Sequence, residues 1–140
     1  MIKRIPILIL ISIILTVLSL SGCEQKGTNV DSNNGKIILD SSVVKLAYSS
    51  LNYSRSAAGD IVRVDVEYLF KNIANKPVAV QVFVKFYDTN DNLLATEGPK
   101  EINLLEGYTE QGISPANIIS YKGKDAAKVD HVTITAKEKT

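Results

Sequence analysis

The sequence predicts an all-β fold, a two-layer antiparallel β-sandwich of about seven strands that follows an apolar N-terminal segment. From residue 37 onward, short runs of β-branched and aromatic residues alternate with turn-forming Gly, Pro, Asn and Asp. These turn signals recur about every 8 to 12 residues, the spacing that is typical of sandwiches. The sequence shows neither a long helical periodicity nor an alternation of strands and helices, so neither pattern favours another fold class.

The two clearest strands are expected at residues 61–71 and 78–87, where apolar residues recur with a period of two. In the first strand, the face expected to point inward carries Val62, Val64, Val66, Tyr68 and Phe70. In the second strand, the inward face carries Val78, Val80, Val82, Val84 and Phe86, and the outward face Ala79, Gln81, Phe83, Lys85 and Tyr87. The two inward faces are predicted to form the core between the sheets.

The other elements are expected to be shorter. A strand at residues 43–48 is expected to carry Val44, Leu46 and Tyr48 on one face, before a polar stretch at 49–60 that contains Leu51 and Tyr53. At most one helical turn is expected, at 125–128. Further short strands are predicted, with Gly98-Pro99, Gly107, Pro115 and Gly123 between them, at 93–97, 101–105, 108–114, 117–121 and 129–136.

Four segments follow one another in a recognisable order: Val66 to Asn72, Asn75-Lys-Pro77, Val80 to Asp88 and Leu105-Glu-Gly107. This arrangement resembles the FxLYD-type immunoglobulin-like domains of prokaryotic lipoproteins. The resemblance covers roughly residues 61–136. It departs from the family pattern at Phe86, where Leu is expected, and before Gly107, where Pro is frequent. Membership would imply an extracytoplasmic immunoglobulin-like β-sandwich without an established chemistry.

The first 22 residues have the layout of a secretory signal peptide. Lys3 and Arg4 precede a 16-residue apolar run that ends at Leu20, followed by the small residues Ser21 and Gly22. A transmembrane helix needs about 20 apolar residues, so cleavage after residue 22 is the favoured interpretation. An ordinary signal peptide in which the following cysteine is incidental remains the alternative.

The junction Leu20-Ser21-Gly22-Cys23 resembles the lipobox of bacterial lipoproteins at all four positions. This resemblance implies that diacylglycerol is attached to the Cys23 sulfur and that Cys23 becomes the mature N-terminus. Two acyl chains hold a small protein on a bilayer far more firmly than one. Because Cys23 is the only cysteine, an intramolecular disulfide is excluded. The expected location is extracytoplasmic and lipid-anchored to the cell membrane.

The mature chain is expected to consist of a lipidated flexible tether, residues 23–36, and one β-sandwich domain, residues 37–140. Thirteen mostly polar residues of this kind would place the domain roughly 20 Å from the lipid. The whole chain has 16 basic and 15 acidic residues, so losing Lys3 and Arg4 with the signal leaves a formal balance of −1. A nearly neutral domain offers no basic field, which argues against a nucleic-acid partner.

Two sets of polar residues are candidate sites. Asp88, Asn90 and Asn92 match the first positions of a calcium-binding loop, but Leu93 and Pro99 stand where that loop needs Gly and Glu. A hairpin turn is therefore favoured. The only histidine, His131, has no readable triad, zinc or phosphate-binding partners, and a surface strand position is favoured. No catalytic, metal or cofactor residue is predicted. A catalytic pair of carboxylates that only folding brings together stays an open alternative.

Phe83 and Tyr87, together with Tyr53 from the preceding polar stretch, are the candidate residues for an exposed aromatic patch that contacts a partner. Coverage of these rings by a neighbouring strand or loop is the favoured alternative. Asn52-Tyr53-Ser54 is also a glycosylation sequon, which matters only in a host that glycosylates exported proteins.

Together these features predict a non-catalytic, membrane-anchored binding module of the cell envelope. Its expected partners are membrane lipid, through Cys23, and an unidentified envelope protein or polymer. The alternative is an accessory lipoprotein that binds a small ligand or a metal, for example in association with a transporter, and an enzyme ranks third. A pocket lined by convergent polar groups would favour the alternative.

Overall fold

The computed structural model describes residues 28–30 and 35–140. The elements are β1 (Thr28–Val30), β2 (Ile37–Asp40), β3 (Val44–Arg55), β4 (Ile61–Asn72), β5 (Val78–Tyr87), β6 (Leu93–Leu104), the 3₁₀ turn η3 (Pro115–Asn117), β7 (Ile118–Tyr121), the 3₁₀ turn η4 (Ala126–Lys128) and β8 (His131–Glu138). The signal segment and Cys23 lie outside the described residues. In the described part, no helix has the length and apolar character needed to span a membrane.

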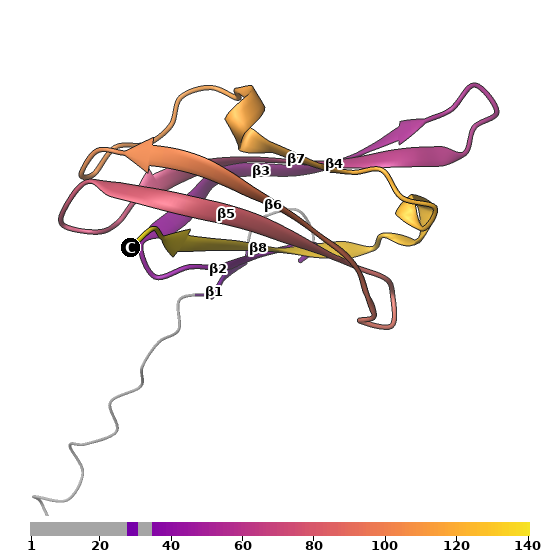
Figure 1. Cartoon of the computed structure of the whole chain (residues 1–140), viewed down its shortest axis with the longest axis horizontal. Coiled ribbons are helices and arrows are strands. Elements are labelled where there is room, and N and C mark those ends of the chain that lie inside the picture. Colours follow the sequence, from indigo (N-terminus) through magenta and orange to yellow (C-terminus); the bar gives the residue numbers. More distant parts are fainter. Residues whose placement is uncertain (1–27, 31–34) are drawn as a thin grey trace, which may run out of the picture.

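The strands form two sheets that pack face to face, as Figure 1 shows. One sheet has the order β1-β2-β8-β5-β6, and the other has the order β3-β4-β7. All neighbouring strands are antiparallel except β2 and β8, which are parallel. The predicted all-β sandwich is thereby confirmed. Antibody constant domains share the two-layer architecture, but their strands are distributed differently between the sheets.

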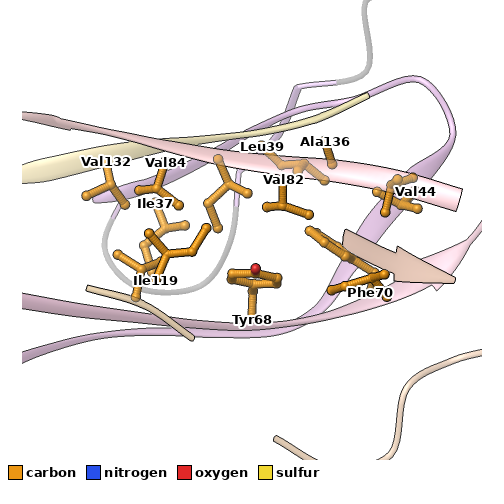
Figure 2. Close-up of a cluster of buried hydrophobic side chains, with 14 of the residues drawn as sticks. Ile37, Leu39, Val44, Tyr68, Phe70, Val82, Val84, Ile119, Val132 and Ala136 are labelled. Atoms are coloured by element: carbon orange, nitrogen blue, oxygen red, sulfur yellow. The ribbon is translucent and has the colours of Figure 1, made fainter. Parts of the chain in front are cut away.

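The core lies between the two inner faces. Every inward residue predicted for β5 is buried, from Val78 to Phe86, and so are four of the five predicted for β4. Figure 2 shows Tyr68, Phe70 and Ile119 of the smaller sheet facing Val82, Val84, Val132 and Ala136 of the larger one. Each large side chain buried in this way stabilises the fold by about 1.5 to 3 kcal/mol.

Val62 is the exception on β4, because 48% of its surface is exposed. It shares the inward side of the strand with Val64, but the β3–β4 hairpin projects beyond the other sheet at this point (Figure 1). An inward position without a facing sheet meets solvent. The prediction that Val62 belongs to the core was therefore wrong.

The predicted course of β3 also needs correction. A register shift between Leu46 and Tyr48 interrupts the alternation, so Tyr48 is 44% exposed while Ser49 is buried. A β-bulge of this kind reverses which residues face inward. The strand then continues to Arg55 through the stretch expected to be polar and irregular. Tyr53 is consequently a strand residue, paired with Val64.

Three other boundaries differ from the prediction. The two short strands expected on either side of Gly98-Pro99 are one strand, β6, with a register shift opposite Val82 and Val84. Gly98 permits this path because its φ is 122° and a Cβ there would lie 2.6 Å from the Val82 carbonyl oxygen. The strand expected at 108–114 is reduced to an isolated bridge between Lys71 and Thr109. The last strand begins at residue 131 instead of 129.

Three residues of the segment expected to be a flexible tether form a strand. Thr28–Val30 forms β1 and pairs antiparallel with β2, with Thr28 opposite Asp40. The rest of that segment up to residue 34 lies outside the described residues. The sheet register therefore fixes where the chain enters the domain, which is at the side where β2 ends.

One end of the sandwich, which we call the Asn72 end, contains the β2–β3 turn (41–43), the β4–β5 turn (73–77) and the segment after β6 (105–108). Asn72 is buried and holds these segments together. Its side-chain amide donates hydrogen bonds to the carbonyl oxygens of Lys76 (2.8 Å) and Leu105 (2.9 Å), and its Oδ1 accepts one from the Ala74 N–H (2.8 Å). One side chain thus satisfies backbone groups from two connections.

Candidate functional site

The opposite end, which we call the His131 end, contains the β3–β4 hairpin turn (56–60), the β5–β6 turn (88–92) and the β7–β8 connection (122–130). It lies at the right of Figure 1. The candidate residues Asp88, Asn90, Asn92 and His131, named in the sequence analysis, make their polar contacts at this end. We therefore describe it as the candidate site.

The centre of this end is a ring stack on the outer face of the larger sheet. Tyr87, the last residue of β5, is directly opposite His131, the first residue of β8. Their ring centroids are 5.2 Å apart and the planes differ by only 8°. Directly opposed residues of neighbouring strands are the pairs that pack most closely in a sheet. The histidine is on a surface strand, as predicted, but its side chain is only 19% exposed.

Two carboxylates flank the imidazole of His131. Its Nε2 is 3.2 Å from Oδ1 of Asp91, and its Nδ1 is 3.3 Å from Oδ2 of Asp130. A neutral imidazole can donate to only one of these oxygens, whereas the imidazolium can donate to both. The two carboxylates lie on opposite edges of the ring, so they do not converge on a common point. Among the described residues, no group of three or more His, Cys, Asp or Glu side chains is arranged to hold a metal ion.

Asp130 links this stack to the N-terminal side of the domain. Its Oδ1 is 3.2 Å from the Lys36 ammonium, and its backbone N–H donates to the Tyr87 carbonyl oxygen at 2.8 Å. The hydrogen bond from Lys36, followed by that from His131, lowers the pKa of Asp130 below its ordinary value. Asp130 is therefore held in its charged form at neutral pH.

Tyr53 reaches this end from the other sheet. Its hydroxyl donates to the carbonyl oxygen of Val129 at 3.1 Å, and burial of the hydroxyl raises its pKa. The bond joins β3 to the β7–β8 connection. Tyr53 thus links β3 to this connection, although 37% of its surface stays exposed.

The predicted hairpin turn after β5 is confirmed, and Asp88 organises it. Its Oδ1 accepts hydrogen bonds from the backbone N–H groups of Asn90 (2.8 Å) and Asn92 (3.0 Å), and its Oδ2 accepts one from the Asn92 amide (3.0 Å). These bonds, above all the one from the Asn92 side chain, lower the pKa of Asp88. Asp91 adopts a φ of 61°, a conformation that Asp tolerates better than most residues.

A groove of about 370 Å³ lies beside this turn, between residues 88–90 and 127–130. The residues that line it include two acidic residues, one basic residue and two apolar ones, namely Asp88, Asp130, Lys128, Ala127 and Val129. Both carboxylates already bind groups of the protein itself, as described above. The groove can accommodate a small polar group of a partner more readily than an enclosed ligand.

The expected patch of Phe83, Tyr87 and Tyr53 is only partly assembled. Phe83 and Tyr87 share the outer face of β5, but Lys85 stands between them and both rings are half-buried. Phe83 lies beside Gly98, where a Cβ would come within 3.4 Å of its ring, and His131 covers Tyr87. Each of these two rings is therefore partly covered by a neighbouring strand and partly accessible to a partner.

Asp91, Asp130 and Lys36 were not singled out from the sequence. Asp130 precedes His131 directly, which is a weak signal that these two side chains can interact. The pairing of His131 with Tyr87 depends on a strand register between residues 44 positions apart. Such a register follows from folding of the whole sheet, so it could not be derived from local spacing.

Comparisons with known proteins add little to this description. No family model matches the sequence, and no curated protein matches it. Among solved structures, the chain is similar to the crystal structure of Campylobacter jejuni cj0090, with 16% sequence identity and a TM-score of 0.42. The match covers 73% of this chain and 98% of that chain. The fold assignment rests on the strands themselves, and the FxLYD resemblance stays a prediction.

Proposed function

We propose that this chain is a lipid-anchored, extracytoplasmic and non-catalytic binding module of the cell envelope. The observation that carries the proposal is the junction Leu20-Ser21-Gly22-Cys23, in which the only cysteine of the chain occupies the lipid-attachment position. Anchoring restricts a protein to a surface and raises its effective concentration there, so that weak contacts suffice for binding.

The His131 end is the surface that we assign to the partner. It combines a rigid stack of two rings, Tyr87 and His131, with exposed charges of both signs from Asp91 and Lys128. Stacked aromatic side chains with polar edges are common anchors in protein interfaces. Asp88, Lys128 and Asp130 of this end are each paired with another group of the protein, which suits recognition by a preformed surface.

The anchor is tested with the full chain expressed in a bacterial host. We expect the mature protein in the membrane fraction to begin at Cys23 and to carry the mass of a thioether-linked diacylglycerol. We expect Cys23→Ser to shift the protein to the soluble fraction or to leave the precursor uncleaved. Normal processing with unchanged membrane fractionation of Cys23→Ser would refute the lipid anchor.

The partner surface is tested by capture from solubilised envelope with the mature domain as bait. We expect the double variant Tyr87→Ala, His131→Ala to lose the captured component. Tyr48→Ala, which removes an exposed aromatic ring of the other sheet, serves as the matched control and should retain it. Equal capture by all three baits would exclude the ring stack as the binding surface.

The accessory function in small-ligand or metal binding remains the second candidate, because the groove beside Asp88 reaches the lower range of ligand-pocket volumes. We rank it second because the carboxylates of the groove already have partners. Calorimetric titration of the mature domain with calcium chloride distinguishes this second candidate from the proposed binding module. A binding heat that Asp88→Asn abolishes would favour the second candidate.

A further inference from the structure

Three large apolar side chains are exposed at the Asn72 end. Leu105 is 70% exposed, Ile73 46% and Tyr108 45%. We call these three residues the apolar tip. They flank the same buried residue, because Ile73 follows Asn72 directly, the Asn72 amide donates to the Leu105 carbonyl, and the Asn72 N–H donates to the Tyr108 carbonyl at 2.9 Å. Exposed apolar residues gathered on one surface indicate an interaction site.

The support under the apolar tip is rigid. The Tyr108 N–H donates to the Leu105 carbonyl at 3.1 Å, and the Ile73 N–H donates to the Val43 carbonyl at 3.0 Å. The three turns of this end are thereby joined by hydrogen bonds. The apolar tip is presented by fixed backbone and does not need to be assembled when it binds.

Charged side chains surround the apolar tip, and Asp40 and Lys45 are exposed at the same end of the sandwich. Lys76 of the β4–β5 turn pairs with Glu138 at 2.7 Å, and Glu106 lies exposed between Leu105 and Gly107. At the His131 end, charged residues such as Asp91 and Lys128 accompany two exposed apolar side chains, Leu93 at 55% and Val62 at 48%. An apolar tip with exposed charges around it suits the boundary between the headgroups and the apolar interior of a bilayer.

The position of β1 indicates which end of the domain lies nearer to Cys23. β1 runs antiparallel to β2, and its first residue, Thr28, lies opposite Asp40, where β2 ends and the turn to Val43 begins. Thr28, the first residue of β1, therefore lies on the side of the Asn72 end. Only four residues separate Cys23 from Thr28, so even a fully extended chain spans about 18 Å between the two.

We propose that the Asn72 end is a membrane-docking surface, whose apolar tip enters the interfacial layer of the bilayer that holds the lipid on Cys23. This inference rests on the proposed lipid anchor. Leu and Ile gain from leaving water, and Tyr suits the interface because its ring is apolar and its hydroxyl polar. The exposed Glu106 restricts the contact to a shallow one. The tether makes even a weak contact persistent.

Docking also sets the orientation of the domain. The ten residues of β5 extend from the Asn72 end to the His131 end, a length of about 33 Å at the usual rise of a strand. With the apolar tip at the bilayer, the stack of Tyr87 and His131 points away from the membrane. The surface assigned to the partner is then held at a defined height above the lipid.

The test uses the lipidated full-length product, in which the Cys23 sulfur is blocked and a newly introduced cysteine is the only free thiol. Glu106→Cys places a fluorophore beside the apolar tip, and Asn90→Cys places one at the turn of the opposite end. The proteins are reconstituted into phosphatidylcholine vesicles that contain doxyl-labelled lipid as a quencher. We expect at least threefold stronger quenching at position 106 than at position 90.

Ile73→Ser and Leu105→Ser, introduced together with Glu106→Cys, should remove most of the difference, while circular dichroism verifies the fold. Equal quenching at both positions in lipidated protein would overturn the docking inference and leave the anchor intact. A fluorophore at position 106 that is shielded from aqueous iodide but not quenched by doxyl lipid would also overturn the docking inference. The apolar tip would then be covered by another protein or by a second copy of this chain. If intact mass shows no lipid on Cys23, the anchor itself fails, and docking falls with it.

Discussion

The two ends of the sandwich are built on the same strands but are stabilised in different ways. At the Asn72 end, one buried, uncharged amide binds backbone groups of two connections. At the His131 end, the exposed carboxylates of Asp88 and Asp130 bind a turn, a lysine and a histidine. Leu105, Ile73 and Tyr108 are exposed beside the buried amide, whereas the carboxylates of the other end lie beside the stack of Tyr87 and His131. Together with the position of Thr28 opposite Asp40, this difference motivates the proposed orientation of the domain on the membrane.

The largest effect is expected from Val82→Asp, because this residue is fully buried in the core that both ends share. Burying an unpaired carboxylate costs more than a domain of this size can tolerate. We expect the thermal transition to disappear or to fall drastically, as followed by circular dichroism. Val62→Asp is the matched control, since Val62 is 48% exposed. A Val82→Asp midpoint within a few degrees of the unmodified protein would refute the core assignment.

The next effect is expected from Asn72→Ala, which should loosen the Asn72 end. It leaves the carbonyl groups of Lys76 and Leu105 and the N–H of Ala74 without their partner. An unsatisfied buried group costs about 1 to 3 kcal/mol, so we expect at least that loss in urea unfolding. Asn75→Ala, in the exposed part of the same turn, should change stability little. Equal losses in the two variants would show that Asn72 is not the organising residue.

Lowering the pH should affect the contribution of Asp88 to stability at the His131 end but not the contribution of Asn72 at the opposite end. The pKa of Asp88 is lowered in the folded state, so its contribution to stability is present above its ordinary pKa and is lost as pH falls through the lowered value. We therefore expect Asp88→Asn to flatten the decline of unfolding free energy below about pH 4. The contribution of Asn72 does not titrate, and Asn72→Ala should leave the shape of this decline unchanged. An identical acid profile for Asp88→Asn and the unmodified protein would contradict the role of the turn.

The smallest effect is expected for the ion pair between Lys36 and Asp130. Both side chains are partly exposed, at 48% and 34%, and such pairs contribute about 0 to 1 kcal/mol. Lys36→Gln should therefore reduce stability slightly at low ionic strength, and the difference should vanish at about 1 M salt, where screening is strong. A loss that persists at high salt would show that Lys36 contributes through packing instead of charge.

The alternation of β5 predicted every buried residue of that strand, because the strand is covered along its full length. The same reasoning was wrong for Val62, where the facing sheet is missing, and for Tyr48, where a bulge reverses the faces. The turn at Asp88 was predicted from local composition, since its hydrogen bonds join neighbouring residues. The stack of Tyr87 on His131 and the contacts of Asn72 join distant segments, and a single sequence does not encode them locally.

The central claim, that the Asn72 end faces the bilayer and the His131 end faces away, is tested most directly by hydrogen–deuterium exchange. The lipidated protein on phosphatidylcholine vesicles is compared with the same domain, beginning after Cys23, free in solution. We predict slower exchange on vesicles for the amides of residues 73–76 and 105–108, and unchanged exchange for residues 88–92. Slower exchange at 88–92 with no change at 73–76 and 105–108 would contradict this orientation.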